Sequence, residues 1–279
     1  MPSDYLNVCI QAAEAGGAQL VDWLGRFAVR EKGPSDLVTQ ADLASQEAVR
    51  SILLGHFPNH TFVGEEDSAT GDFGSEYCWI VDPLDGTTNY VHRIPHYAVS
   101  IALVKDHQPV VATVFDPISG ECFSAEQGSG AFLNGQRVSV SEVTELGQAV
   151  VAASFSARVD PTSPEIGQFV DALLSFQGVR RTGSAALNMC YVACGRFDAF
   201  WALTTKAWDV AAGELLVREA GGVVTHFTGK PFDLRRPHPA ASANGVLHEA
   251  FLSLLNAGTR SPRVVASEAP TSRHAIPRA

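Results

Sequence analysis

A short apolar run at 79–81 leads directly to a pair of aspartates, Asp82 and Asp85, in the sequence Asp-Pro-Leu-Asp-Gly-Thr-Thr-Asn. Pro83 has no N–H to donate and is expected to interrupt strand pairing, while Gly86 permits a tight turn. Two carboxylates on one turn, beside the backbone N–H groups of a helix start, can hold a divalent cation and a phosphate together. The simpler alternative is an acidic turn that only caps a helix.

Two further acidic residues stand where they could complete such a site. Glu65 lies in Val-Gly-Glu-Glu-Asp at the expected end of a strand, and Asp209 lies in Lys-Ala-Trp-Asp-Val-Ala-Ala-Gly at the start of an apolar helix. Taken alone, Glu65 fits a solvated acidic loop and Asp209 fits an ordinary N-cap. Mg²⁺ prefers hard oxygen ligands, so carboxylates with a substrate phosphate suit it better than His or Cys. Chemistry at such a site needs no Ser, Cys or His nucleophile.

The composition excludes several other classes of protein. The 279-residue chain is 46% hydrophobic and has a net charge of −10, which argues against a general binder of nucleic acids or of anionic membranes. Its five cysteines contain no Cys-x-x-Cys, so reduced thiols are expected. The chain has no apolar run of about 18 residues, and its start, Met-Pro-Ser-Asp, does not suggest a signal peptide. We expect a soluble, cytoplasmic protein with no nucleic-acid or membrane partner.

Helices and strands in the first half must position the acidic residues. Helical periodicity covers 4–31, up to a Gly-Pro pair, and returns at 42–56 with Asp42 near its start. Runs typical of strands follow at 61–63, 78–81, 98–104, 110–115, 121–125, 131–133 and 138–140. Asn134-Gly135 separates the last two and is a strong hairpin signal. The turns between these runs favour an antiparallel meander.

A second unit is expected to begin near residue 147. Strands are predicted at 150–154, 179–181, 198–203 and 223–224, and helices at 165–176, 185–194, 208–220 and 247–256. We therefore divide the chain into an N-terminal α+β half at 1–146, with the main acidic motifs, and a C-terminal α/β half at 147–258, with Asp209. The last stretch, 259–279, is rich in Ser, Pro, Ala and Arg and is predicted to be a disordered tail.

Together these motifs resemble the inositol monophosphatase family of magnesium-dependent, lithium-sensitive phosphatases. The resemblance extends from residue 4 to residue 257 and includes Asp36-Leu-Val-Thr39 followed by Asp42, Gly128-Ser-Gly-Ala-Phe132, Gly183-Ser-Ala-Ala186 and Glu219-Ala-Gly-Gly222. It implies an α/β protein of the α+β type, a layered αβαβα sandwich of the sugar-phosphatase kind with mixed and antiparallel sheets. It also implies a homodimer. The two halves would then be parts of one sandwich.

The resemblance implies a role for each matching residue. A first Mg²⁺ would be bound by Glu65, Asp82 and the backbone carbonyl of Leu84, and a second by Asp82, Asp85 and Asp209, with a third ion near Glu65. Asp42 and Thr87 would orient the attacking water, and Glu65 would be a further catalytic residue. The implied substrate-binding residues are Asp85, Gly86, Thr87, Gly183, Ser184, Ala185, Asp209 and Lys206. The reaction implied is hydrolysis of an inositol or sugar phosphate by direct attack of water.

One position departs from the family pattern and leaves the substrate open. Many members that prefer inositol phosphates have a Glu seven residues before the aspartate that matches Asp209, where this chain has Ala202. A methyl group cannot accept a hydrogen bond, and losing a charge-assisted bond costs about 1.5–3 kcal/mol. Lys206 could favour a second phosphate or acidic group instead, or be a solvated lysine.

The alternatives to an inositol phosphate are fructose 1,6-bisphosphate, histidinol phosphate or a 3′-phosphonucleotide on the same fold with the same chemistry. A third hypothesis is a non-catalytic binding module. The complete set of carboxylates argues against such a module, because a protein that had lost its activity would be expected to lack one.

Overall fold

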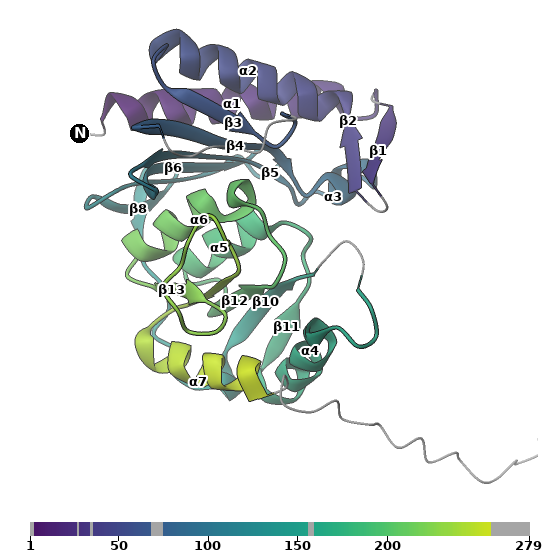
Figure 1. Ribbon diagram of the computed structural model, residues 1–279, viewed down its shortest axis with the longest axis vertical. Coiled ribbons are helices and arrows are strands. Elements are labelled where there is room, and N and C mark those ends of the chain that lie inside the picture. Colours follow the sequence, from purple (N-terminus) through teal and green to yellow (C-terminus); the bar gives the residue numbers. More distant parts are fainter. Residues whose placement is uncertain (1–2, 27, 34–35, 68–74, 156–158, 258–279) are drawn as a thin grey trace, which may run out of the picture.

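Five layers of secondary structure stack along the longest axis of the molecule (Figure 1). The computed structural model describes residues 3–26, 28–33, 36–67, 75–155 and 159–257. Its helices are α1 (Asp4–Trp23), α2 (Gln40–His56), α3 (Thr87–Val91), α4 (Pro164–Ser175), α5 (Ala185–Ala193), α6 (Ala207–Glu219) and α7 (Gly245–Ala257), with a 3₁₀ turn at Leu146–Gln148. Helices α1 and α2 cover one sheet, α5 and α6 form the middle layer, and α4 and α7 cover the second sheet on its outer face. The expected αβαβα sandwich is confirmed.

The first sheet has seven strands in the order β3-β4-β5-β6-β7-β8-β9. They are β3 (Thr61–Gly64), β4 (Tyr77–Asp85), β5 (Ala98–Lys105), β6 (Gln108–Asp116), β7 (Glu121–Glu126), β8 (Gly130–Leu133) and β9 (Gln136–Val138). Only the β3–β4 pair is parallel, and the remaining pairs form the predicted antiparallel meander. Asn134 and Gly135 make the predicted hairpin with φ angles of 48° and 76°, the left-handed conformation that a tight two-residue hairpin requires.

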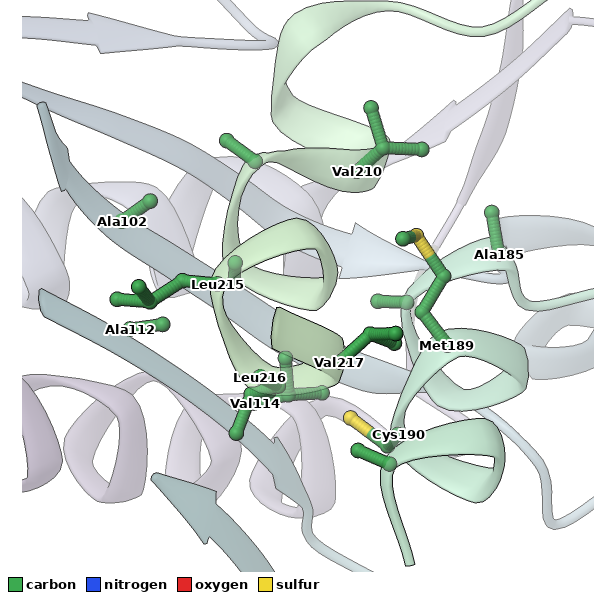
Figure 2. Close-up of a cluster of buried hydrophobic side chains, with 14 of the residues drawn as sticks. Ala102, Ala112, Val114, Ala185, Met189, Cys190, Val210, Leu215, Leu216 and Val217 are labelled. Carbon is green, nitrogen blue, oxygen red and sulfur yellow. The ribbon is translucent and has the colours of Figure 1, made fainter. Parts of the chain in front are cut away.

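The middle helices join the two sheets through a continuous apolar core. Figure 2 shows Ala102, Ala112 and Val114 of the first sheet facing side chains of α6 and α5. The two helices approach each other closely at Gly213, where an added Cβ would lie 2.5 Å from Cβ of Met189. This dense packing fixes α5 and α6 against each other.

The second sheet has five strands in the order β11-β10-β12-β14-β13. They are β10 (Val150–Ser154), β11 (Gly178–Arg180), β12 (Ala199–Ala202), β13 (Val223–His226) and β14 (Pro239–Ser242). Strand β10 runs parallel to β11 and β12, whereas β14 is antiparallel to β12 and β13. Trp201 and Phe251 are buried between this sheet and the outer helices, so the sheet is covered on both faces.

The structure differs from the sequence prediction at the end of the first helix and in strands that were not predicted. The helix predicted at 4–31 ends at Trp23, because Gly25 adopts a φ of 78° that ends the helical path, and β1 (Val29–Gly33) then pairs with β2 (Asp36–Thr39). Strand β14 was not predicted, since Pro-Ala-Ala-Ser lacks the β-branched and aromatic residues typical of strands. The predicted disordered tail at 259–279 lies outside the described residues. Among the helices described here, none has both the length and the apolar character needed to cross a membrane.

Candidate active site

The paired aspartates of the first motif lie in a β-bulge at the end of β4. Asp82 pairs with Ser100 and Asp85 pairs with Ala98, so three steps along β4 oppose two steps along β5. Pro83 lies inside this irregularity, where the strand pairing does not require an N–H from it. The expected interruption of strand pairing is therefore a bulge, after which pairing resumes at Asp85.

The bulge turns both aspartates toward the middle layer. In a regular strand, residues three apart point to opposite faces. Ile80 packs in the core beside α5 and α6, but Leu84 packs in the core beside α1 and α2, although both are even-numbered positions of β4. The alternation has therefore shifted by one residue between them, which brings Asp82 and Asp85 to the same face.

Asp85 is held at the N-terminus of α5. The Ser184 hydroxyl donates to Oδ2 of Asp85, the Ala186 N–H donates to the same oxygen at 2.8 Å, and the Ala185 N–H donates to Oδ1 at 3.3 Å. Burial raises the pKa of Asp85 to about 6, and these donors oppose that rise. Ser184 and Ala185, predicted to contact the substrate, thus contact Asp85 directly.

Asp82 and Asp209 are drawn into the same acidic group. Burial raises the pKa of Asp82 well above its ordinary value, and the neighbouring charges of Glu65, Asp85 and Asp209 raise it further. The pKa of Asp209 is also raised well above its ordinary value, first by loss of solvent and then by Asp85 and Glu65. Its Oδ2 accepts the Lys206 N–H at 2.7 Å, which fixes Asp209 in the first turn of α6. The predicted acidic residues of separate motifs therefore meet in space.

The donor chemistry of this group fits magnesium. In the described part of the chain, no Lys, Arg or His side chain forms an ion pair with Asp82, Asp85 or Asp209. Neighbouring negative carboxylates repel one another, and a divalent cation supplies the positive charge that offsets this repulsion. Among the described residues, no three His, Cys, Asp or Glu side chains are arranged to hold one ion by themselves. Mg²⁺ does not require such a cage, because it keeps several waters and binds through one or two carboxylates plus substrate oxygens.

Asp42 and Thr87 are brought together beside the bulge. The Thr87 hydroxyl lies 3.5 Å from Oδ1 of Asp42 and 3.1 Å from the carbonyl oxygen of Leu84. Oδ2 of Asp42 accepts the N–H and the hydroxyl of Thr39 at 2.9 and 2.6 Å, in a capping box at the start of α2. Burial raises the pKa of Asp42 to about 6, while the Thr39 donors lower it and Glu65 raises it.

The turn at Gly86 is held closely against the loop that carries Gly183. Gly86 has a φ of 98°, and a Cβ there would lie 3.1 Å from the backbone oxygen of His96. The side-chain amide of Asn89 donates to the carbonyls of His96 and Thr182 at 2.7 and 2.9 Å, and so ties the two loops together. Asn89 is the last residue of the acidic motif, and this tethering role is not predicted from its position in the sequence.

Ala202 and Lys206 flank the site on the segment before α6. Ala202 is completely buried at the end of β12, and Lys206 is exposed immediately before Asp209's helix begins. The Thr205 hydroxyl donates to the carbonyl of Pro237, which anchors the segment between them. Ala202 therefore contributes a buried methyl group with no hydrogen-bonding atom, whereas the Lys206 side chain is open to solvent.

Comparison with known proteins agrees with this geometry. A model of the Inositol monophosphatase family matches residues 1–260. "Inositol monophosphatase 2" of Solanum lycopersicum is 41% identical over 264 residues, which cover 91% of this chain and 98% of the relative. The crystal structure of "extragenic suppressor protein suhB" from Bartonella henselae superposes with a TM-score of 0.86 at 38% identity, covering 91% of this chain and 98% of that one.

A third similar protein is an "IMPase/NADP phosphatase complexed with Mg2+ and phosphate", whose structure gives a TM-score of 0.77 at 27% identity and covers 86% of this chain and 90% of that one. The family match spans residues 1–260, and each of the three similar proteins covers 86% or more of this chain. The chain therefore belongs to the inositol monophosphatase family.

Proposed function

We propose that the chain hydrolyses small phosphate monoesters with Mg²⁺, by direct attack of water. The observation that carries this proposal is the meeting of Asp82, Asp85 and Asp209 from β4 and α6, with raised pKa values that each owes in part to acidic neighbours. Family membership makes the chain a phosphoric monoester hydrolase. The IMPase/NADP phosphatase complexed with Mg²⁺ and phosphate has the same fold, which supports magnesium as the cofactor here.

In this proposal Glu65, Asp82, Asp85, Asp209 and the Leu84 carbonyl would hold two or three Mg²⁺ ions. Bound Mg²⁺ would supply positive charge that neutralises the phosphate and the leaving alkoxide.

The protein's own part is to place the water and the phosphate. When the Thr87 hydroxyl donates to Asp42, its lone pair can accept from a water and orient the oxygen of that water. The Gly86 and Thr87 N–H groups, at the start of α3, would bind phosphate oxygens.

Phosphate release from an ester such as inositol 1-phosphate tests this function. Turnover should require Mg²⁺ and stop with EDTA, and Asp85→Asn should abolish it. The control is Asp106→Asn, because Asp106 lies in an exposed turn at a φ of 49° that Asn tolerates. Metal-dependent turnover that survives Asp85→Asn would contradict the proposal. Inhibition by lithium should accompany Mg²⁺ dependence.

The substrate proposed is a small phosphorylated sugar or inositol, with Lys206 favouring one that carries a second anionic group. Ala202 cannot bond a sugar hydroxyl, whereas Lys206 is exposed beside Asp209. Fructose 1,6-bisphosphate, histidinol phosphate and a 3′-phosphonucleotide belong in the same panel. The preference for bisphosphorylated over monophosphorylated sugars should fall in Lys206→Ala. An unchanged preference would leave Lys206 as a solvated lysine.

We also propose a cytoplasmic homodimer. All five cysteines are free, as expected for reduced thiols. Helix α4 exposes four apolar side chains, Ile166, Val170, Leu173 and Leu174. Because these side chains carry no charge, the same patch on a second copy of the chain can pack against them across a two-fold axis. Light scattering should give twice the chain mass, and Leu173→Glu should lower it to that of one chain.

The division at 1–146 and 147–258, each half holding one large sheet, is proposed as two parts of one sandwich.

A further inference from the structure

The loop that carries Glu65 is fixed by hydrogen bonds from every backbone N–H between Gly64 and Asp67. Gly64 N–H donates to Oδ2 of Asp67 at 3.0 Å, and Glu65 N–H donates to the Val81 carbonyl at 3.0 Å. Glu66 N–H donates to Oε1 of Gln46 at 3.0 Å, and Asp67 N–H returns to the Gly64 carbonyl at 3.2 Å. Gly64 is the last residue of β3, so these bonds continue the order of the strand into the loop that follows it.

Two side chains of α2 supply the anchor for this loop. Nη2 of Arg50 lies 2.6 and 2.7 Å from the two carboxylate oxygens of Asp67, and Nε2 of Gln46 donates to Oδ1 at 3.2 Å. The Arg50 guanidinium also lies 4.0 Å from the centre of the Phe62 ring. Gln46 is 6% exposed and packs directly on Gly64, where an added Cβ would lie 2.1 Å from Oε1. Arg50, Gln46 and Asp67 thus form a clamp, here called the α2 clamp.

The clamp lies on the same face of α2 as the predicted water-orienting residue. Asp42, Gln46 and Arg50 are spaced four apart, which places them on one side of a helix. Ser45, next to Gln46, donates to the Pro83 carbonyl at 2.9 Å, inside the β4 bulge. One helix therefore reaches Asp42, the bulge and the Glu65 loop together.

We infer that the α2 clamp is a positioning device that sets the Mg²⁺ affinity of the site through Glu65. The inference rests on the proposed function in one respect, which is that Glu65 is a metal ligand. Asp67 is the third acidic residue in Gly-Glu-Glu-Asp, yet its carboxylate is satisfied by Arg50, Gln46 and Gly64. It is therefore committed to holding the loop, while Glu65 faces the acidic group. Residues that orient metal ligands typically change metal affinity 10- to 100-fold when they are altered.

Titration calorimetry with Mg²⁺ alone, on the full chain without substrate, measures the effect apart from turnover. Arg50→Lys keeps the charge but loses the planar guanidinium that contacts Asp67 and covers the Phe62 ring, and should weaken Mg²⁺ binding roughly tenfold. Gln46→Met removes the bond to Glu66 and should act in the same direction. With Mg²⁺ at saturation, kcat of Arg50→Lys should return to near the wild-type value, because the clamp touches no reacting atom.

The matched control is Arg196→Lys. Arg196 also pairs with a carboxylate beside an aromatic ring: Nη1 lies 2.7 Å from Oε2 of Glu121, Nη2 lies 2.5 Å from Oε1, and the guanidinium lies 5.0 Å from the Tyr191 ring, at the far end of α5 from Asp85. This variant should leave Mg²⁺ affinity unchanged. A double-mutant cycle with Glu65→Gln tests whether the α2 clamp acts on Mg²⁺ affinity through Glu65.

In the Glu65→Gln background, Arg50→Lys should weaken Mg²⁺ binding no further. An equal tenfold loss in that background, or no loss in the wild-type background, would overturn the inference. Either outcome leaves the phosphatase proposal intact if Asp85→Asn still abolishes turnover. If Arg50→Lys weakens Mg²⁺ binding but the wild-type protein shows no Mg²⁺-dependent turnover, only the proposed function is overturned.

Discussion

Helix α6 carries two carboxylates with raised pKa values in two different settings. Asp209, in its first turn, shares its surroundings with Asp85 and Glu65 from other elements. Glu214 lies five residues later and is 4% exposed, and its Oε1 forms an ion pair with Nε of Arg218 at 2.7 Å on the same helix. Its Oε2 has no hydrogen-bond partner among the described residues. A raised pKa therefore does not by itself mark a site; acidic groups converging from separate elements do.

The largest expected difference between the two positions is in catalysis. Asp209→Asn should lower kcat/KM at least 1,000-fold, or about 4 kcal/mol, since it removes a proposed ligand charge. Glu214→Gln should retain nearly full activity. The same Asp209→Asn change should stabilise the metal-free protein, because it relieves repulsion with Asp85. Phosphate release and urea unfolding in EDTA measure the two effects, and comparable activity loss in both variants would remove the distinction.

The second difference is in the pH dependence of stability. Burial raises the pKa of Glu214 from 4.5 to about 7. The unfolded chain loses this proton at a lower pH than the folded protein, so the stability contributed by the protonated form is complete below pH 4.5 and falls as pH rises toward 7. Glu214→Gln should match the wild type near pH 5 and exceed its free energy of unfolding by about 2–3 kcal/mol at pH 8.

Urea unfolding at pH 5 and pH 8 measures this effect. Glu249→Gln, at an exposed position of α7, is the control and should show no such pH dependence. A constant difference between Glu214→Gln and the wild type at both pH values would contradict the assigned cause.

A smaller loss is expected at the water-orienting pair. Thr87→Ala removes the hydroxyl between Asp42 and the Leu84 carbonyl, and should lower kcat roughly 100-fold with little change in KM. Thr87→Ser keeps the hydroxyl and should restore most of the rate. Steady-state kinetics at saturating Mg²⁺ are the measurement, and equal losses in the Ala and Ser variants would assign the effect to packing.

The smallest effect is expected at the N-terminus of α5. The Ser184 hydroxyl opposes the burial that raises the pKa of Asp85, so Ser184→Ala should raise that pKa further. Because a carboxylate binds metal in its ionised form, Mg²⁺ affinity at pH 6.5 should fall about fivefold, or about 1 kcal/mol, and recover as pH rises. Calorimetry from pH 6 to 8 measures this. A loss that stays constant with pH would point to weakened capping of α5 instead.

The acidic residues of the site could be predicted from sequence, but the bulge and the hydrogen bonds that position them could not. The order of Asp82, Pro83, Asp85 and Gly86 indicates a strand leading to a tight acidic turn, and the structure has both. The bulge that turns the two aspartates to one face depends on pairing with β5, which no local pattern specifies. The end of α1 was missed because apolar spacing continued past Gly25, although the glycine was a visible stop signal.

The α2 clamp was missed for a different reason. The spacing of Asp42, Gln46 and Arg50 was present in the sequence, but polar residues at helical spacing usually face solvent. The role of Asp67 is not visible in the sequence, because its partner Arg50 lies 17 residues away. Asn89 was likewise visible as a motif residue, yet its two acceptors lie on loops that only the fold brings together. Long-range partners decide these roles, and single-residue patterns do not contain them.

The run of bonded N–H groups from Gly64 to Asp67 has a consequence for the exchange of amide hydrogens with solvent. Loop amides normally exchange within the time needed to mix a sample, because water reaches them freely. These four are held by a strand carbonyl, by side chains of α2 and by the loop itself, so they can exchange only when that support opens. Their deuterium uptake should follow the opening of α2 from the sheet, and Glu65 would then be as rigid as the strand that precedes it.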